Sequence, residues 1–302
     1  MTPVVRVSGL SKSFGDLRAV SNLSFSVGQG QVYGFLGQNG AGKSTTIRML
    51  MTLIEPSEGE IEIFGMNLRK HRKEILRQTG AVIERPDLYK YLTAKENLRL
   101  FARLSGVKPS EKMIMDQLDL VGLTARANSR VKTYSQGMKQ RLGLACALVH
   151  DPGLIILDEP SNGLDPQGIA DMRRLIIHLS RDRGKTLLVS SHLLSEMEMM
   201  ADQLLIIHKG KKVVEGSMDE LLHPEATLTE LVTTDNKHTA DLLEQSEWAV
   251  FLKESLNGML RLSMHKDKIP ALNRWLVEMG AEVKSLRPLD SLEDYFLSIT
   301  KE

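Results

Sequence analysis

The sequence predicts an α/β fold built on a mainly parallel sheet. Three observations lead to this prediction: apolar strands alternate with amphipathic helices, a glycine-rich loop joins a strand to a helix, and an Asp-Glu pair ends a buried strand. With 302 residues, 42% of them hydrophobic, the chain is long enough for one large domain and a smaller one.

Bulk composition gives no sign of a highly charged partner, although a locally basic groove remains possible. The 39 basic and 38 acidic residues leave a net charge of +1, so no charge excess indicates a nucleic acid or an anionic membrane surface. No apolar run approaches the roughly 18 residues of a membrane-spanning helix, and no signal peptide is expected. The single cysteine, Cys146, lies in an apolar run, where we expect a buried structural thiol.

The core elements follow from short apolar runs and helical spacing. The strands expected near the N-terminus are antiparallel, and the later ones are buried in the parallel sheet. The expected strands are 4–10, 23–27, 31–36, 60–64, 81–83, 154–157, 186–189 and 204–207. Expected helices are 44–53, 93–104, 111–121, 137–149 and 167–180. The helical stretch from about 85 to 150 is predicted to form a subdomain inserted in the core.

The composition changes past residue 220, so we expect a core domain at 1–220 and a small α/β accessory domain at 221–302. Residues 224–237 are polar and weakly periodic. Beyond them we expect, in order, a strand near 259–263, a helix near 268–279, a strand near 282–286 and a helix near 291–299.

A phosphate-binding loop is the most specific motif. Residues 37–44 fit G-x-x-x-x-G-K-[ST] between an apolar strand and a helix, which is the context that this motif requires. Backbone N–H groups and the helix N-terminus would hold phosphate oxygens, Lys43 would reach the β- and γ-phosphates, and the Ser44 hydroxyl would bind Mg²⁺. The residues predicted to contact the nucleotide here are Gly37, Gln38, Asn39, Gly40, Ala41, Gly42, Lys43, Ser44 and Thr45. The alternative is a chance glycine-rich turn.

Asp158 and Glu159 follow the buried strand 154–157. In an open α/β sheet the carboxyl ends of the strands face the ligand crevice. Asp158 is therefore a candidate Mg²⁺ ligand, and Glu159 a candidate catalytic residue that orients the attacking water. A solvated acidic turn is the alternative.

Residues 134–138, Tyr134-Ser135-Gln136-Gly137-Met138, open a helix ahead of the acid pair. Residues 1–220 resemble the ATP-binding cassette (ABC) ATPases, and the deciding element is this one. It is similar to the family's signature motif, and the resemblance implies that Ser135 and Gly137 bind the γ-phosphate held by a partner subunit. Two subunits would therefore enclose two ATP molecules.

Other motifs occur in the order of this family. The resemblance implies that Phe14 stacks on adenine, that Asp165 lies in the loop joining the two sites, and that His192 is a catalytic switch residue sensing the γ-phosphate. The alternative for Phe14 is an ordinary core side chain. Asp165 is also a candidate N-cap for the following helix, and both roles can hold.

Glu84 stands where the family usually has a glutamine that contacts Mg²⁺ and faces the permease. This glutamate, the phrase at 92–98 and the signature region resemble ABC-2-type exporters of bacitracin and lantibiotic resistance. A carboxylate would give Mg²⁺ a charged ligand in place of a neutral amide. The metal ligands predicted are thus Ser44, Asp158 and Glu84, unless Glu84 is merely tolerated.

The resemblance implies an ATP- and Mg²⁺-dependent ATPase subunit that forms a homodimer or heterodimer and drives a separate permease from the cytoplasmic face of the membrane. The main alternative is a soluble ABC ATPase that acts on ribosomes or DNA. Such proteins carry two cassettes or a long coiled coil, and this sequence has one cassette and no sustained heptad repeat. A regulatory cassette without catalysis is the second alternative.

Overall fold

A computed structural model of the chain describes residues 3–222, 227–256 and 259–288. The chain divides into two compact units, Met1–Gly216 and Ser217–Glu302. In the described residues no helix combines the length and the apolarity needed to cross a bilayer.

The first unit is built on a six-stranded sheet with the order β10-β9-β3-β8-β7-β6. Its pairs β3·β8, β3·β9, β7·β8 and β6·β7 are parallel. The strands are β3 (Val32–Leu36), β6 (Thr79–Val82), β7 (Leu154–Asp158), β8 (Thr186–Ser191), β9 (Gln203–His208) and β10 (Lys211–Ser217). This confirms the predicted α/β core, and every residue of β3, β7 and β8 is buried, as unbroken apolar runs require.

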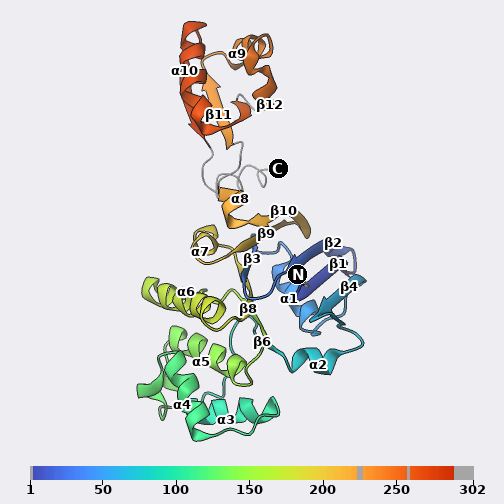
Figure 1. The fold of residues 1–302 in the computed structure, drawn as a ribbon, viewed down its shortest axis with the longest axis vertical. Helices are drawn as coiled ribbons and strands as arrows, with labels where there is room; N and C mark the ends of the chain where they lie inside the picture. The colour runs from blue at the N-terminus through green and yellow to red at the C-terminus, as the bar shows by residue number, and fades with distance from the viewer. Residues whose placement is uncertain (1–2, 223–226, 257–258, 289–302) are drawn as a thin grey trace. The chain divides into compact units, whose positions relative to one another are not determined.

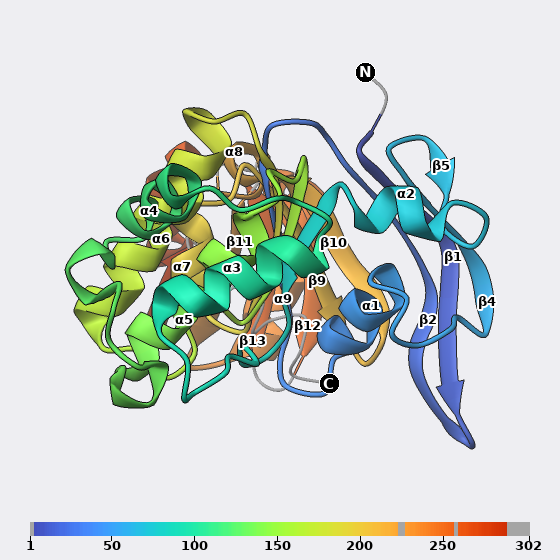
Figure 2. The ribbon, with the colours of Figure 1, turned by 90° about the horizontal axis from the view of Figure 1, so that it is seen from below.

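A second, antiparallel sheet of the order β2-β1-β4-β5 covers one side of this core (Figure 2). Its strands are β1 (Val5–Phe14), β2 (Leu17–Val27), β4 (Glu58–Ile63) and β5 (Met66–Asn67). Helix α1 (Lys43–Leu50) packs in the same hydrophobic core, since Ile47 and Leu50 cluster with Val7 of β1 and Ile156 of β7. The helix that begins at the phosphate loop is therefore held by both sheets.

Three helices form the inserted subdomain: α3 (Ala94–Leu104), α4 (Glu111–Leu120) and α5 (Gln136–Leu148), grouped together in Figure 1. Thr93 and Glu96 form a capping box at the start of α3, each bonding to the other's backbone N–H. Cys146 of α5 is buried as predicted, and burial raises the pKa of its thiol. The remaining α-helices among the described residues of this unit are α2 (Arg72–Leu76), α6 (Pro166–Arg181) and α7 (Leu194–Glu198).

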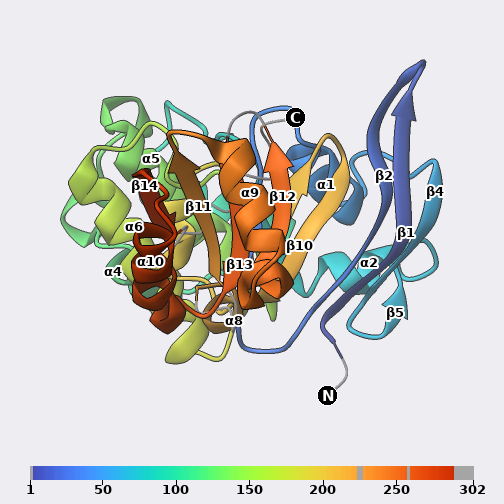
Figure 3. The same cartoon turned by 90° about the horizontal axis from the view of Figure 1, so that it is seen from above.

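The second unit has the order of elements β-α-β-β-α-β and an antiparallel sheet β12-β13-β11-β14 (Figure 3). This order is that of two interleaved split β-α-β motifs, the ferredoxin-like arrangement. After α8 (Met218–Leu222) its elements are β11 (Thr227–Thr233), α9 (Asn236–Glu244), β12 (Leu252–Leu256), β13 (Met259–Met264), α10 (Ile269–Glu278) and β14 (Val283–Pro288). The alternate residues Leu260, Leu262 and Met264 of β13 pack in one core with Leu243 of α9 and Leu276 of α10.

The expected elements that lie among the described residues agree with the structure in type. Helix α1 ends at Leu50 rather than at residue 53, where Thr52 takes a positive φ of 57° that a right-handed helix excludes. The polar and weakly periodic stretch 224–237, to which the sequence assigns no element, contains β11 and the start of α9. The helix expected near 291–299 lies outside the described residues.

Candidate active site

The phosphate loop lies between the carboxyl end of β3 and the start of α1. Gln38, Asn39 and Gly40 are exposed, whereas Gly37 and Gly42 are buried. Gly42 has a φ of 105°, and a Cβ there would lie 2.7 Å from the carbonyl oxygen of Ala19. Only glycine fits this position, so the turn that opens α1 depends on it.

Lys43 is buried and points back into the loop. Its Nζ donates to the carbonyl oxygens of Gly37 at 2.6 Å and Gln38 at 3.3 Å, and it lies 3.1 Å from Oε1 of Glu159. Its side chain is only 5% exposed. A buried ammonium group needs such acceptors, and a bound phosphate would offer it stronger ones.

Asp158 ends β7 and is buried, 1% exposed. Ser190 lies opposite it in the parallel register of β8. The Ser190 hydroxyl donates to Oδ1 of Asp158 at 2.5 Å and accepts from the backbone N–H of Glu159 at 2.9 Å. The other oxygen, Oδ2, is buried and has no hydrogen-bond partner among the described residues. A buried carboxylate oxygen left unpaired in this way fits a ligand for a hard cation such as Mg²⁺.

Glu159 connects Lys43 with His192. Nδ1 of His192, just after β8, donates to Oε2 of Glu159 at 2.7 Å, while Oε1 of the same carboxylate faces Lys43. Glu159 has a φ of 51°, an uncommon backbone conformation for a residue other than glycine. Such outliers cluster at functional sites, so the strain agrees with a catalytic position.

The sheet order explains why these residues meet. Strand β8 lies between β3 and β7, all three are parallel, and each ends at the same edge. Motifs that are far apart in the sequence, at Lys43, Asp158 and His192, therefore converge.

Phe14 is not a core residue. It ends β1 with 49% of its surface exposed, and Nζ of Lys12 lies 5.0 Å from its ring centroid. The structure thus argues against the alternative of a buried packing residue. An exposed aromatic ring is free to stack on a ligand.

The signature residues open α5. Ser135 is its exposed N-cap, and its hydroxyl accepts from the backbone N–H of Met138 at 3.3 Å; Gly137 follows in the first turn. Asp165 is the N-cap of α6, where its carboxylate accepts from the N–H of Gly168 at 2.9 Å. The structural role predicted for Asp165 is therefore present.

Glu84 follows β6 at the same sheet edge, with its side chain 58% exposed and a φ of 59°. It forms an ion pair with Arg48 of α1. Glu84 is therefore not brought to Asp158 as a free ligand, and binding a cation would require it to exchange this partner.

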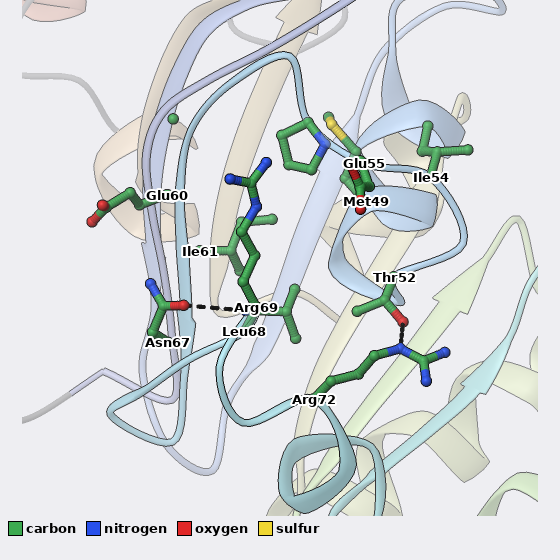
Figure 4. Close-up of a pocket in the computed structure, with 12 residues that line it drawn as sticks. Met49, Thr52, Ile54, Glu55, Glu60, Ile61, Asn67, Leu68, Arg69 and Arg72 are labelled. Atoms are coloured by element: carbon green, nitrogen blue, oxygen red, sulfur yellow. Dashed lines mark hydrogen bonds between the residues drawn. The ribbon is translucent and has the colours of Figure 1, made fainter.

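A separate cavity of about 550 Å³ lies beside the end of α1 and the segment from β4 to α2 (Figure 4). Nε of Arg72 donates to Oγ1 of Thr52 at 2.7 Å across it. Its lining contains none of the residues predicted from the motifs. The site described above is thus the one that the motifs assemble.

Known proteins share both the sequence and the fold. The sequence model described as ABC transporter matches residues 20–162. The chain is 44% identical to the bacitracin transport ATP-binding protein BcrA of Bacillus licheniformis, over 99% of this chain and 98% of that protein. The chain belongs to the ABC transporter ATP-binding proteins. It is therefore an ABC ATPase, and membership favours the transporter over a soluble ribosome- or DNA-directed ATPase.

Two further matches cover about seven-tenths of this chain. The lantibiotic transport ATP-binding protein SrtF of Streptococcus pyogenes is 41% identical over 72% of this chain and 92% of its own length. A solved structure of an ATP-binding subunit of an ABC transporter is 33% identical, with a TM-score of 0.65 over 72% of this chain and 91% of the other. The second unit is thus shared with BcrA, whereas SrtF and this solved structure match about the length of the cassette.

Proposed function

We propose that this ABC ATPase is the subunit that hydrolyses ATP–Mg²⁺ to drive an exporter of antimicrobial peptides of the bacitracin or lantibiotic kind. The observation that supports ATP hydrolysis is the pair of contacts that Glu159 makes, with Lys43 of the phosphate loop and with His192. The full-length similarity to BcrA supports the exporter type.

In the proposed reaction the phosphates of ATP lie in the loop 37–44 and the adenine stacks on Phe14. The γ-phosphate competes for Lys43, which then releases Oε1 of Glu159. Glu159 orients the attacking water by accepting a hydrogen bond from it, while His192 holds the carboxylate in place through Oε2. Lys43 and His192 stabilise the negative charge of the transferred phosphoryl group.

Ser44 and Asp158 would hold the cation, and Glu84 is the third proposed ligand. A bound Mg²⁺ would neutralise charge on the β- and γ-phosphates. Ser190 would keep Oδ1 of Asp158 engaged, so that Oδ2 remains available to the cation or its water.

We further propose that two subunits enclose two ATP molecules, with Ser135 and Gly137 of one facing the phosphates of the other. The exposed N-terminus of α5 supports this, since the backbone N–H groups at the start of a helix attract a phosphate. The loop after Glu84 exposes Tyr89 and Tyr91, 53% and 79% accessible, which suits contact with a permease at the cytoplasmic face of the membrane. Residues 1–220 would form the catalytic domain and 221–302 the accessory domain.

Expression with its permease in a bacitracin-sensitive host tests this proposal. The wild-type pair should raise the inhibitory concentration of bacitracin or of a lantibiotic, and the Glu159→Gln pair should not. Full ATPase activity without any resistance to either class would leave the hydrolysis in place and refute the proposed substrate class.

A further inference from the structure

A second carboxyl group is buried beside the contacts of Glu159 and His192. Glu196 lies on α7, the short helix that follows His192, and is only 7% exposed. Its Oε1 atom is inaccessible and finds no hydrogen-bond partner within the described parts of the chain. The proposed reaction does not use this group, although burying a carboxyl group is costly.

Glu196 reaches the site through a small cavity. The cavity, about 170 Å³ in volume, is lined by Glu196 together with Glu159, Ser161 and His192. It is large enough for several water molecules, and it offers them polar partners. The buried acid therefore lies behind the catalytic pair rather than on an unrelated surface.

Ser161 connects this acid with the loop 161–165. The side chains of Ser161 and Glu196 line the same cavity, and Ser161 is only 8% exposed. A hydrogen bond from the Ser161 hydroxyl acts to lower the pKa of the Glu196 carboxyl group. Within the loop, the N–H of Leu164 donates to the carbonyl oxygen of Ser161 at 3.2 Å, and Asp165 then caps α6. One side chain thus joins the helix after His192 to the loop after Glu159.

The charge state of Glu196 suits this position. Burial raises the pKa of its carboxyl group, and the negative charge of Glu159 raises it further. The hydrogen bond from Ser161 and the charges of His192 and Arg173 lower this pKa, but the net shift is upward. Because its pKa is raised, this carboxyl group keeps its proton to a higher pH than an ordinary glutamate, and in the protonated form it lies near Glu159 without the repulsion between two carboxylates. It also retains an oxygen that accepts from Ser161.

We propose that Glu196 is a positioning residue that fixes the loop 161–165 against the segment carrying His192, and thereby holds Glu159 and His192 in the arrangement that hydrolysis needs. The inference rests on the proposed role of Glu159. In the proposed dimer the loop 161–165 faces the second site, so Glu196 connects that loop to the catalytic pair of its own subunit.

Steady-state ATPase assays on the full-length protein test this, with kcat and KM measured separately. Glu196→Ala should lower kcat at least tenfold and leave KM for ATP within about threefold, because the phosphate loop and Phe14 are untouched. Glu196→Gln should restore kcat to within about threefold of wild type, since the amide oxygen still accepts from Ser161. Ser195→Ala is the matched control, because Ser195 is exposed on the same helix.

A double-mutant cycle with Ser161→Ala distinguishes positioning from loss of fold. Ser161→Ala should lower kcat as Glu196→Ala does, and the double variant should lose no more than either single one. Wild-type kcat in Glu196→Ala, or fully multiplicative losses in the double variant, would overturn the proposal. So would a loss in Glu196→Gln as large as that in Glu196→Ala with an unchanged melting temperature. Glu159→Gln, assayed in parallel, reports separately on the proposed chemistry.

Discussion

Oε2 of Glu159 accepts a hydrogen bond from Nδ1 of His192 at 2.7 Å, although the two residues follow different strands of the sheet. The other oxygen of the same carboxylate faces the buried Lys43. Glu159 is therefore held from two sides, and its neighbours are the two residues proposed to stabilise the transferred phosphoryl group.

The first prediction concerns Glu159 itself. Glu159→Gln keeps the shape of the side chain and can still contact Lys43 and His192, but its amide cannot act as a base. We expect kcat for ATP to fall by roughly 10²- to 10⁴-fold, the usual contribution of a positioned acid or base, with little change in nucleotide affinity. Single-turnover hydrolysis and nucleotide binding measure the two quantities, and a fall of less than threefold in hydrolysis would contradict the role.

Phe14→Ala tests the stacking of adenine. Because the ring is half exposed, its removal should change the free energy of unfolding by less than about 0.5 kcal/mol. Loss of stacking on a base should weaken ATP binding by about 1–3 kcal/mol. Fluorescence titration with an ATP analogue measures the affinity, and Leu17→Ala, at an exposed apolar residue of β2, is the control. Equal affinities of Phe14→Ala and wild type would exclude the contact.

Glu84→Ala tests the proposed Mg²⁺-linked role. We expect Mg²⁺-dependent hydrolysis to fall while ATP binding stays largely intact. Since Glu84 pairs with Arg48, Arg48→Ala is needed alongside it. Arg48→Ala should leave Mg²⁺-dependent hydrolysis unchanged or increase it, because this substitution frees the Glu84 carboxylate. Wild-type turnover in Glu84→Ala at limiting Mg²⁺ would refute the Mg²⁺-linked role of Glu84.

Glu196 should make stability depend on pH. Its pKa is higher in the folded protein than the ordinary glutamate value, so the folded state binds the proton more tightly than the unfolded chain. Wild-type stability relative to Glu196→Gln should therefore be greatest below the ordinary glutamate pKa and fall as pH rises through the folded-state pKa.

Thermal melting of wild type and Glu196→Gln from pH 4 upward measures this difference. The melting temperature of the Gln variant should rise relative to that of wild type as pH rises, and the difference between the two should become constant above the folded-state pKa of Glu196. Parallel curves over the whole range would show that burial does not disfavour the charged form of Glu196.

Local sequence patterns were sufficient to place the glycine-rich loop ahead of a helix, the acid pair at the end of a buried strand, and Asp165 as a helix cap. Each depends on neighbours in the chain: Gly42 opens a helix, Asp158 ends a buried strand, and Asp165 caps a helix. The sequence analysis assigned no strand at β11, whose seven residues include three threonines and whose two neighbouring strands lie far along the sequence. Pairing between distant strands, rather than local propensity, determines such a strand.

The residues that sequence reasoning missed owe their roles to contacts with residues far away in the sequence. Ser190 acquires its role because the parallel register sets it opposite Asp158, and Arg48 because α1 brings it to Glu84. Glu196 reads in the sequence as one more polar residue of a short helix, and only the fold shows that it is buried. The exposure of Phe14, likewise, could not be decided from its place in a strand.

The most direct test of the account is affinity purification of tagged Glu159→Gln protein from its native membranes, in mild detergent with ATP present. Slowed hydrolysis should trap the closed dimer on its permease, so a polytopic membrane protein should co-purify in an ATP-dependent manner. A dimer that brings down no membrane protein, or one that carries ribosomes or DNA, would contradict the transporter function.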